Sequence, residues 1–201
     1  METANRITKI VEILRKNDAG LTDASQRAFR DNDNGKSFDL DKLIVRLGGK
    51  AITEEEYNIG KEEGKKIFLV AKAALLKDDD GTFVIIYKAG STPEEQAVIK
   101  AHEIGHFCLQ WLHRWDDANT GVILSNFTTE DNGYWKELEA NSFAAHLLIT
   151  DREFIRELNA VSDEIEVNIE KLAKRLGVTE DLVLRRNAEF KSKYDFGLGI
   201  G

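Results

Sequence analysis

Apolar residues recur at helical spacing in two segments of the N-terminal half. The first stripe lies within 7–14 and the second within 40–47, each at i, i+3, i+4 and i+7. This spacing predicts two amphipathic helices. Gly48-Gly49 predicts the end of the second helix, and the polar segment 17–37 predicts a loop between them. The residues of the two stripes are Ile7, Ile10, Val11, Leu14, Leu40, Leu43, Ile44 and Leu47.

The middle of the chain changes from helical to strand-like patterning. Segments 67–76 and 82–87 are rich in residues that favour strands, and Asp-Asp-Asp-Gly at 78–81 lies between them. This arrangement predicts a β-hairpin. Charges and two glycines at 53–65 weaken any helix there. If strand 82–87 lies at the sheet edge, it could bind an extended peptide through main-chain hydrogen bonds.

The second half of the chain is predicted to be mainly helical. Thr92-Pro93-Glu94-Glu95 combines a cap, a first-turn proline and a capping box, so a helix should run from there to about His113. Residues 114–134 predict mostly loop, and a second helix should run from about Tyr134 to Leu148. Three short helices should follow, with a break at Gly177 and a cap at Thr179.

The composition is that of a packed globular protein. The chain has 201 residues, of which 42% are hydrophobic and 32% charged, and its net charge is -8. This acidity argues against nucleic acid as the partner of the whole surface. Cys108 is the single cysteine, which excludes an internal disulfide. No apolar run suits a signal peptide or membrane span, so we expect a cytoplasmic protein.

One short motif carries the candidate chemistry. His102-Glu103-Ile104-Gly105-His106 matches H-E-x-x-H, and on a helix the two histidines share a face and can bind one ion. Zinc is the expected metal, although manganese can replace it in such sites. Glu103 is placed to act as the base for a metal-activated water. Two packed core histidines are the alternative interpretation, which the scarcity of histidine disfavours.

The third metal ligand is expected on the second helix. His113 lies too far along the first helix to share the ion, and Leu109 and Leu112 exclude a metzincin pattern. Glu137 begins a stripe of small residues suited to close helix packing, so it is the first candidate. Glu139 is the second candidate for the third ligand, and Asn141 could orient a ligand. Tyr134 and His113 are the candidates for stabilising an oxyanion.

The two motifs together resemble the ImmA/IrrE metallopeptidase family. The similarity includes AHEIGHFCL, then ELEANSFAAHLL, and covers roughly residues 40–150. It implies a zincin-like α+β core with a small antiparallel sheet, the ligands His102, His106 and Glu137, and Glu103 as the catalytic base. The chain departs from the family at Ile149-Thr150, where a proline is usual. We expect a metallopeptidase domain at 1–150 and a helical module at 151–201.

The resemblance also implies a role. Family members cleave helix-turn-helix repressors and so derepress genes of stress response or mobile elements, which predicts a repressor as the protein substrate. The rival from another class is an antirepressor or toxin-type binding module with a structural metal. Residues 172–186 resemble a helix-turn-helix, and 169–194 carry seven Lys or Arg against four Asp or Glu. This weak basic excess does not favour DNA binding.

Overall fold

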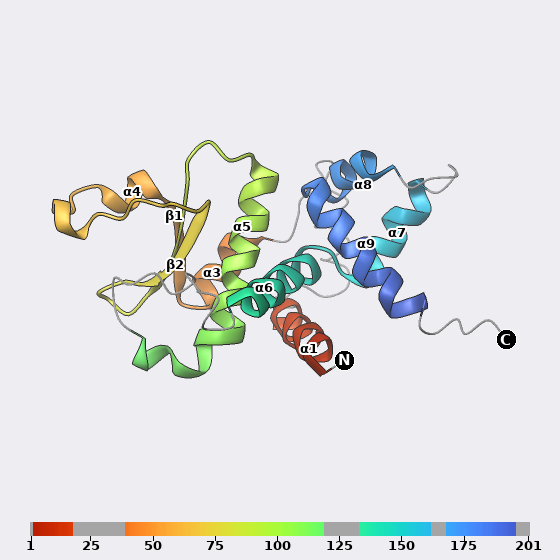
Figure 1. The fold of residues 1–201 in the computed structure, drawn as a ribbon, viewed down its shortest axis with the longest axis horizontal. Helices are drawn as coiled ribbons and strands as arrows, with labels where there is room; N and C mark the ends of the chain where they lie inside the picture. Colours follow the sequence, from red (N-terminus) through yellow and green to blue (C-terminus); the bar gives the residue numbers. More distant parts are fainter. Residues whose placement is uncertain (1, 18–38, 119–132, 162–167, 196–201) are drawn as a thin grey trace. The chain divides into compact units, whose positions relative to one another are not determined.

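The computed structural model describes residues 2–17, 39–118, 133–161 and 168–195 (Figure 1). They divide into two compact units. The sheet unit is Asp39–Ala144, and the helical unit joins Met1–Phe38 to Ala145–Gly201. The division falls inside one continuous helix, α6 (Gly133–Leu148). The two domains expected from the sequence, 1–150 and 151–201, stay a prediction. The loop expected at 17–37 lies almost wholly outside the described residues, as does most of the loop at 114–134.

A three-stranded sheet forms the centre of the sheet unit. Its strand order is β1-β3-β2, with β1 at Gly49–Thr53, β2 at Ala73–Lys77 and β3 at Phe83–Tyr87. Strands β2 and β3 pair antiparallel and confirm the predicted hairpin, whereas β1 pairs parallel to β3 and was not predicted. Since β3 is the central strand, strand 82–87 does not lie at the sheet edge, so the condition for peptide pairing along it is not met. The edges are β1 and β2.

Both faces of the sheet are covered. One face packs in a hydrophobic cluster with side chains from α4 (Glu54–Asn58) and the segment that follows it. The short helix α4 forms where the sequence indicated little helix, because Thr53 and Glu56 make a capping box. On the other face, Phe83 stacks on Phe107 with ring centroids 4.2 Å apart. The cluster consists of Tyr57, Leu69, Ala74, Leu76, Val84 and Ile86.

Helix α5 (Pro93–His106) carries the H-E-x-x-H motif and packs against the sheet and α3 (Leu40–Arg46). It begins with the predicted capping box, in which Glu95 N donates to Thr92 Oγ1 at 3.2 Å. The regular α-helix ends at His106 and not near His113. A π-helical segment at Phe107–Trp111 and a 3-10 helix at Leu112–Asp117 follow it.

Helices α5 and α6 approach closely at Gly105. A Cβ atom added there would lie 3.1 Å from Ala140 Cα and 3.2 Å from Phe143 Cβ, which is tighter than ordinary packing. Ala140 and Phe143 are themselves fully buried. The missing side chain at Gly105 therefore lets the α6 backbone come near the motif helix.

The helical unit contains α1 (Glu2–Asn17), α7 (Asp151–Val161), α8 (Ile169–Leu176) and α9 (Glu180–Asp195). The predicted break at Gly177 is confirmed by its left-handed φ of 66°. Thr150 makes a capping box with Glu153, so α7 begins directly where the family usually has proline. Among the described helices, none combines the length and the apolar character needed to cross a membrane.

Candidate metal centre

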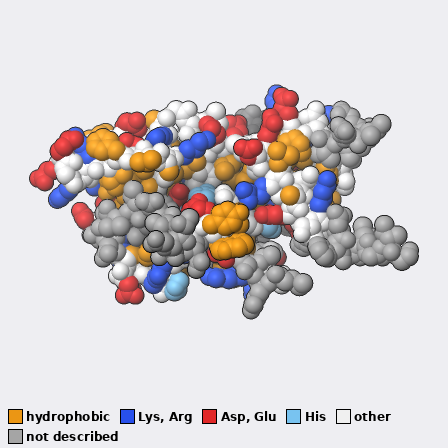
Figure 2. Space-filling view, in the orientation of Figure 1, with side chains coloured by type: hydrophobic (Ala, Val, Ile, Leu, Met, Phe, Trp, Pro, Cys, Tyr) orange, Lys and Arg blue, Asp and Glu red, His pale blue; other side chains and the backbone are white. Residues whose placement is uncertain are grey.

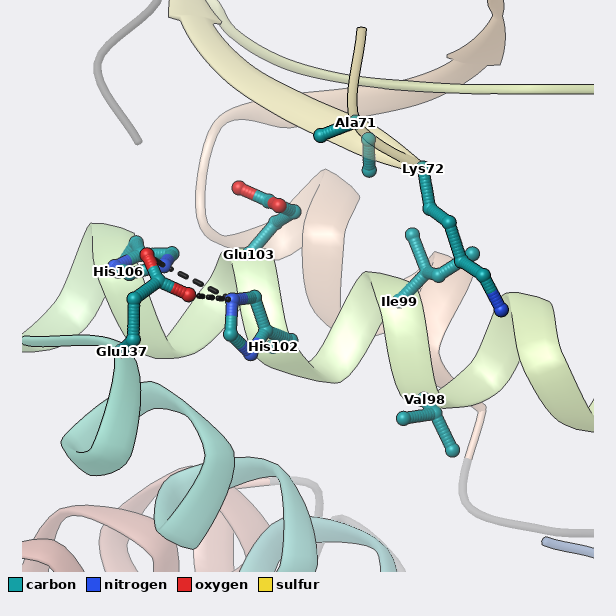
Figure 3. Close-up of a pocket in the computed structure, with 9 residues that line it drawn as sticks. Ala71, Lys72, Val98, Ile99, His102, Glu103, His106 and Glu137 are labelled. Carbon is teal, nitrogen blue, oxygen red and sulfur yellow. Dashed lines mark hydrogen bonds and ion pairs between the residues drawn. The ribbon is translucent and has the colours of Figure 1, made fainter. Parts of the chain in front are cut away.

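Three side chains from two helices meet at one point (Figure 3). His102 and His106 come from α5, and their Nε2 atoms lie 3.0 Å apart. Glu137 comes from the first turns of α6, where its Oε2 lies 3.2 Å from His102 Nε2 and its Oε1 lies 3.2 Å from His106 Nε2. These three residues are the cluster of possible metal ligands among the described residues.

The donor atoms suit a divalent ion. Two imidazole nitrogens and one carboxylate are a common catalytic zinc set, and the fourth position stays open. Ligands at about 2.0–2.1 Å from a tetrahedral ion lie roughly 3.3 Å from one another. The observed separations of 3.0 and 3.2 Å are close to that value. The residues therefore fit a zinc-type site without rearrangement of the two helices.

Electrostatics keep Glu137 in the form that a ligand needs. Burial raises the pKa of this carboxyl, but hydrogen bonds and charge from His102 and His106 outweigh burial and lower the pKa to about 2. For His102, burial lowers the pKa, yet the hydrogen bond to Glu137 and the charges of Glu103 and Glu137 produce a net rise. Protons therefore compete with an ion for His102, and ion binding should weaken in acid.

The outward nitrogens of both imidazoles also have partners. Asn141 Oδ1 lies 3.1 Å from His102 Nδ1, in the place expected of a residue that orients this ring. Gln110 Oε1 lies 3.0 Å from His106 Nδ1, and this residue was not identified from the sequence. The signal was present, since residues 102, 106 and 110 follow one another at intervals of four along one helical face.

Glu103 lies beside the cluster and faces the same cavity (Figure 3). Its side chain is only 4% exposed. The cavity has a volume of about 260 Å³ and extends along α5 to the start of β2. Besides the cluster and Glu103, its lining residues are Ala71, Lys72, Ala73, Val98 and Ile99.

The remaining candidates lie elsewhere. Glu139 is outside the cluster, and its Oε2 lies 3.5 Å from Gln110 Nε2. Tyr134 is 65% exposed and pairs edge-on with Trp135, and His113 is exposed on the 3-10 helix. Neither Tyr134 nor His113 is among the described residues that line the cavity, so the structure does not bring these two oxyanion candidates to the ligands.

Comparison with known proteins identifies a family. The model of the IrrE N-terminal-like domain, a peptidase family, matches residues 65–187, which is more than half of the chain. No curated protein sequence matches significantly. Among solved structures, a Mycobacterium tuberculosis transcriptional regulator is similar with a TM-score of 0.46 and 18% identity, over 90% of this chain and 51% of that one. The chain thus spans about half the length of that regulator.

Proposed function

The chain belongs to the peptidase family of the IrrE N-terminal-like domain, and we propose that it is a zinc-dependent, site-specific endopeptidase. One observation carries the proposal: His102, His106 and Glu137 converge beside the buried carboxylate of Glu103, at the wall of one cavity. Bound zinc would supply Lewis-acid polarisation and lower the pKa of a water molecule. Manganese is the alternative ion for the same donors.

Glu103 is the residue proposed to move the proton. It follows His102 directly, so its carboxylate projects from α5 into the cavity and not into the ligand cluster. A carboxylate there can accept a proton from a water molecule as the water attacks a peptide carbonyl. It can then return the proton to the nitrogen of the leaving amine. The low exposure of Glu103 keeps bulk water from competing for that proton.

An extended peptide is the substrate shape that the cavity wall favours. Lys88 N donates to Lys72 O at 3.1 Å, and Ala73 pairs with Tyr87. Main-chain groups alternate in direction along an antiparallel pair, so those of Ala73 point away from β3, toward the outer edge of β2. Because Ala73 also lines the cavity, a substrate strand pairing there would bring its backbone next to Glu103.

The proposed substrate is a helix-turn-helix repressor, on the basis of the family resemblance. The DNA-binding alternative loses support in the C-terminal helices. Arg186 is 1% exposed and bonded to Asp151, and Arg175 is paired with Glu157, so two of the basic residues there are engaged within the protein. On the face drawn in Figure 2, acidic and basic side chains are interspersed over the described parts. DNA binding usually needs a stronger basic surface.

The test is Glu103→Gln, assayed with a repressor encoded next to this chain. The wild type with zinc should cut the repressor at one site. The variant should keep its zinc and cut about 10²–10⁴-fold more slowly, because the proton acceptor is lost. Glu94→Gln is the matched control, since it removes an exposed carboxylate from the first turn of the same helix. It should cut at the wild-type rate.

Two outcomes separate the rivals. Equal cleavage by wild type and Glu103→Gln would contradict the proposed mechanism. Repression relieved equally by both proteins in cells, with the repressor intact, would instead identify a non-proteolytic antirepressor. In that case the metal would be structural, and His106→Ala should unfold the protein.

A further inference from the structure

Gln110 contacts the metal-facing histidine His106 from behind. It lies in the π-helical segment that follows α5, and such segments are frequent at functional sites. Its side chain is 7% exposed, and its Oε1 lies 3.0 Å from His106 Nδ1. A buried amide in this position can influence which nitrogen of the imidazole carries the proton.

Glu139 determines which end of the Gln110 amide faces the imidazole. A glutamine amide has a donor end and an acceptor end, and rotation by half a turn would exchange them. Glu139 Oε2 lies 3.5 Å from Gln110 Nε2, which is a long hydrogen bond. An ionised carboxylate only accepts, so the NH2 group must face Glu139. The carbonyl oxygen is then left to face His106.

This order fixes the hydrogen on the imidazole. Gln110 Oε1 can only accept, so His106 Nδ1 must donate, and in the neutral ring Nε2 then carries a lone pair. Nε2 is the atom that lies 3.2 Å from Glu137 Oε1 and 3.0 Å from His102 Nε2. We propose that Gln110 and Glu139 are a pair of positioning residues that hold His106 in the Nδ1–H tautomer, with Nε2 directed at the metal.

The proposal rests on the proposed zinc site. It gives Glu139 a positioning role, whereas the sequence had suggested it as the second candidate for the third metal ligand. Helix α6 then contributes twice: Glu137 faces the cluster, while Glu139, two residues on, orients the amide behind it. Outer partners of metal-bound histidines typically affect metal affinity by about 10–100-fold. Because Glu139 acts through Gln110, their effects should not add.

The test measures zinc affinity by competition with a chromophoric chelator. Gln110→Leu should weaken zinc binding by about 10–100-fold. Glu139→Gln should weaken it less, since the amide at 110 can still adopt the correct orientation part of the time. The double variant Gln110→Leu/Glu139→Gln should be no weaker than Gln110→Leu alone. Gln96→Leu is the matched control, because Gln96 is on α5 but donates to Ser91 O. It should bind zinc as the wild type does.

An exchange variant distinguishes positioning from mere packing. Gln110→Glu combined with Glu139→Gln exchanges the two groups. The carboxylate at 110, which only accepts, then lies next to His106, and the amide at 139 can donate to that carboxylate. This exchange should restore zinc affinity to within about threefold of the wild type, far better than Gln110→Leu, because the donor order is preserved. Nitrogen NMR of the zinc-free proteins should show a proton on His106 Nδ1 in the wild type and the exchange variant, and only partial protonation of Nδ1 in Gln110→Leu.

The zinc measurements distinguish failure of the positioning pair from failure of the proposed zinc site. If the wild type binds no zinc, the metal site fails and the positioning pair fails with it. If the wild type binds zinc and Gln110→Leu binds it equally well, only the positioning pair is refuted. Additive losses in the double variant, or no recovery in a folded exchange variant, would also refute it. Circular dichroism of each variant checks that folding is retained.

Discussion

Acidic side chains have different neighbours in the two units: Glu157 is buried between arginines, and Glu137 is part-exposed beside two histidines. In the helical unit, each Oε atom of Glu157 lies against a guanidinium group, at 2.6 Å from Arg156 and 2.8 Å from Arg175. In the sheet unit, Glu137 lies against two imidazoles whose Nε2 atoms are directed at the same point. Imidazoles can lose their charge near neutrality, whereas guanidinium groups cannot.

The difference distinguishes Glu157, which stabilises the fold, from Glu137, which is proposed to bind a metal ion. A buried carboxylate paired with arginine has its charge balanced by the protein itself. A carboxylate that faces two imidazoles has its charge balanced only if the imidazoles carry a proton or a metal ion joins the three groups. The contacts of Glu157 therefore stabilise the helical unit, whereas the cluster around Glu137 has the donor set of the proposed metal site.

The largest effect should come from Glu137→Ala. Losing a ligand should weaken zinc binding by more than the roughly 10–100-fold typical of outer partners. Chelator competition measures the loss. The control in the other unit is Glu153→Ala, which removes an acid that lies 3.1 Å from Arg15. It should lower stability and leave zinc affinity unchanged, and equal zinc loss in both variants would remove the contrast between the units.

Arg186→Met tests the helical unit, where we expect the ion pairs to affect stability and not zinc binding. Arg186 is 1% exposed, donates to Ile149 O at 2.9 Å and pairs with Asp151, so it ties α9 to the start of α7. Asp151 is 30% exposed, so removing Arg186 should cost less than breaking a fully buried pair, about 1–3 kcal/mol. Urea unfolding of the zinc-free protein should show this loss. Zinc affinity of the folded fraction should remain within about twofold of the wild type, and a loss of tenfold or more would contradict the separation.

The candidate site was more predictable from the sequence than the sheet around it. Helical spacing alone places His102 and His106 on one face, and the small residues on α6 indicated that Glu137 would approach them. Gln110 was missed because no motif marks it, although it continues the same four-residue interval. Its partner Glu139 is in α6, so only the packing of the π-helical segment after α5 against α6 brings the two together.

Strand β1 could not be predicted because it is stabilised by pairing with a distant strand and not by its own local sequence. Gly49–Thr53 is five residues long and contains glycine and lysine, so its own strand tendency is weak. It is a strand because Ala51 pairs with Ile85 in the centre of the sheet. The same pairing places 82–87 in the middle and leaves β2 at the edge. Such long-range pairing decides which strand faces a substrate, and local pattern does not reveal it.

Gly105→Ala should have a smaller effect, on the approach of α6 to α5. The added methyl group would lie 3.1 Å from Ala140 Cα and 3.2 Å from Ala140 O, both backbone atoms that cannot rotate away. Alanine favours helix by up to about 1 kcal/mol, but overpacking typically costs about 1–3 kcal/mol. We expect a net loss of stability of about 1 kcal/mol and weaker zinc binding, since Glu137 moves with α6. Unchanged zinc affinity would contradict the close-packing argument.

Glu157→Gln should produce the smallest effect, which depends on pH. Burial raises the pKa of Glu157, but hydrogen bonds and charge from Arg156 and Arg175 outweigh it and hold the pKa below its ordinary value of 4.5. A lowered folded pKa contributes stability that is fully present above about pH 4.5 and is lost as the pH falls through the folded value. Both arginines are about half exposed, at 55% and 45%, so the contribution is about 1 kcal/mol or less.

Urea unfolding of the zinc-free protein at several pH values measures the stability that the ionised Glu157 carboxylate contributes. The wild type should be more stable than Glu157→Gln at neutral pH, and the difference should shrink as the solution is acidified below about pH 4.5. Glu180→Gln is the control, since it removes an exposed carboxylate at the start of α9. It should show little difference from the wild type at any pH. A gap between wild type and Glu157→Gln that widens in acid would show that the arginines do not stabilise the ionised carboxylate, and the contrast with Glu137 would lose its basis.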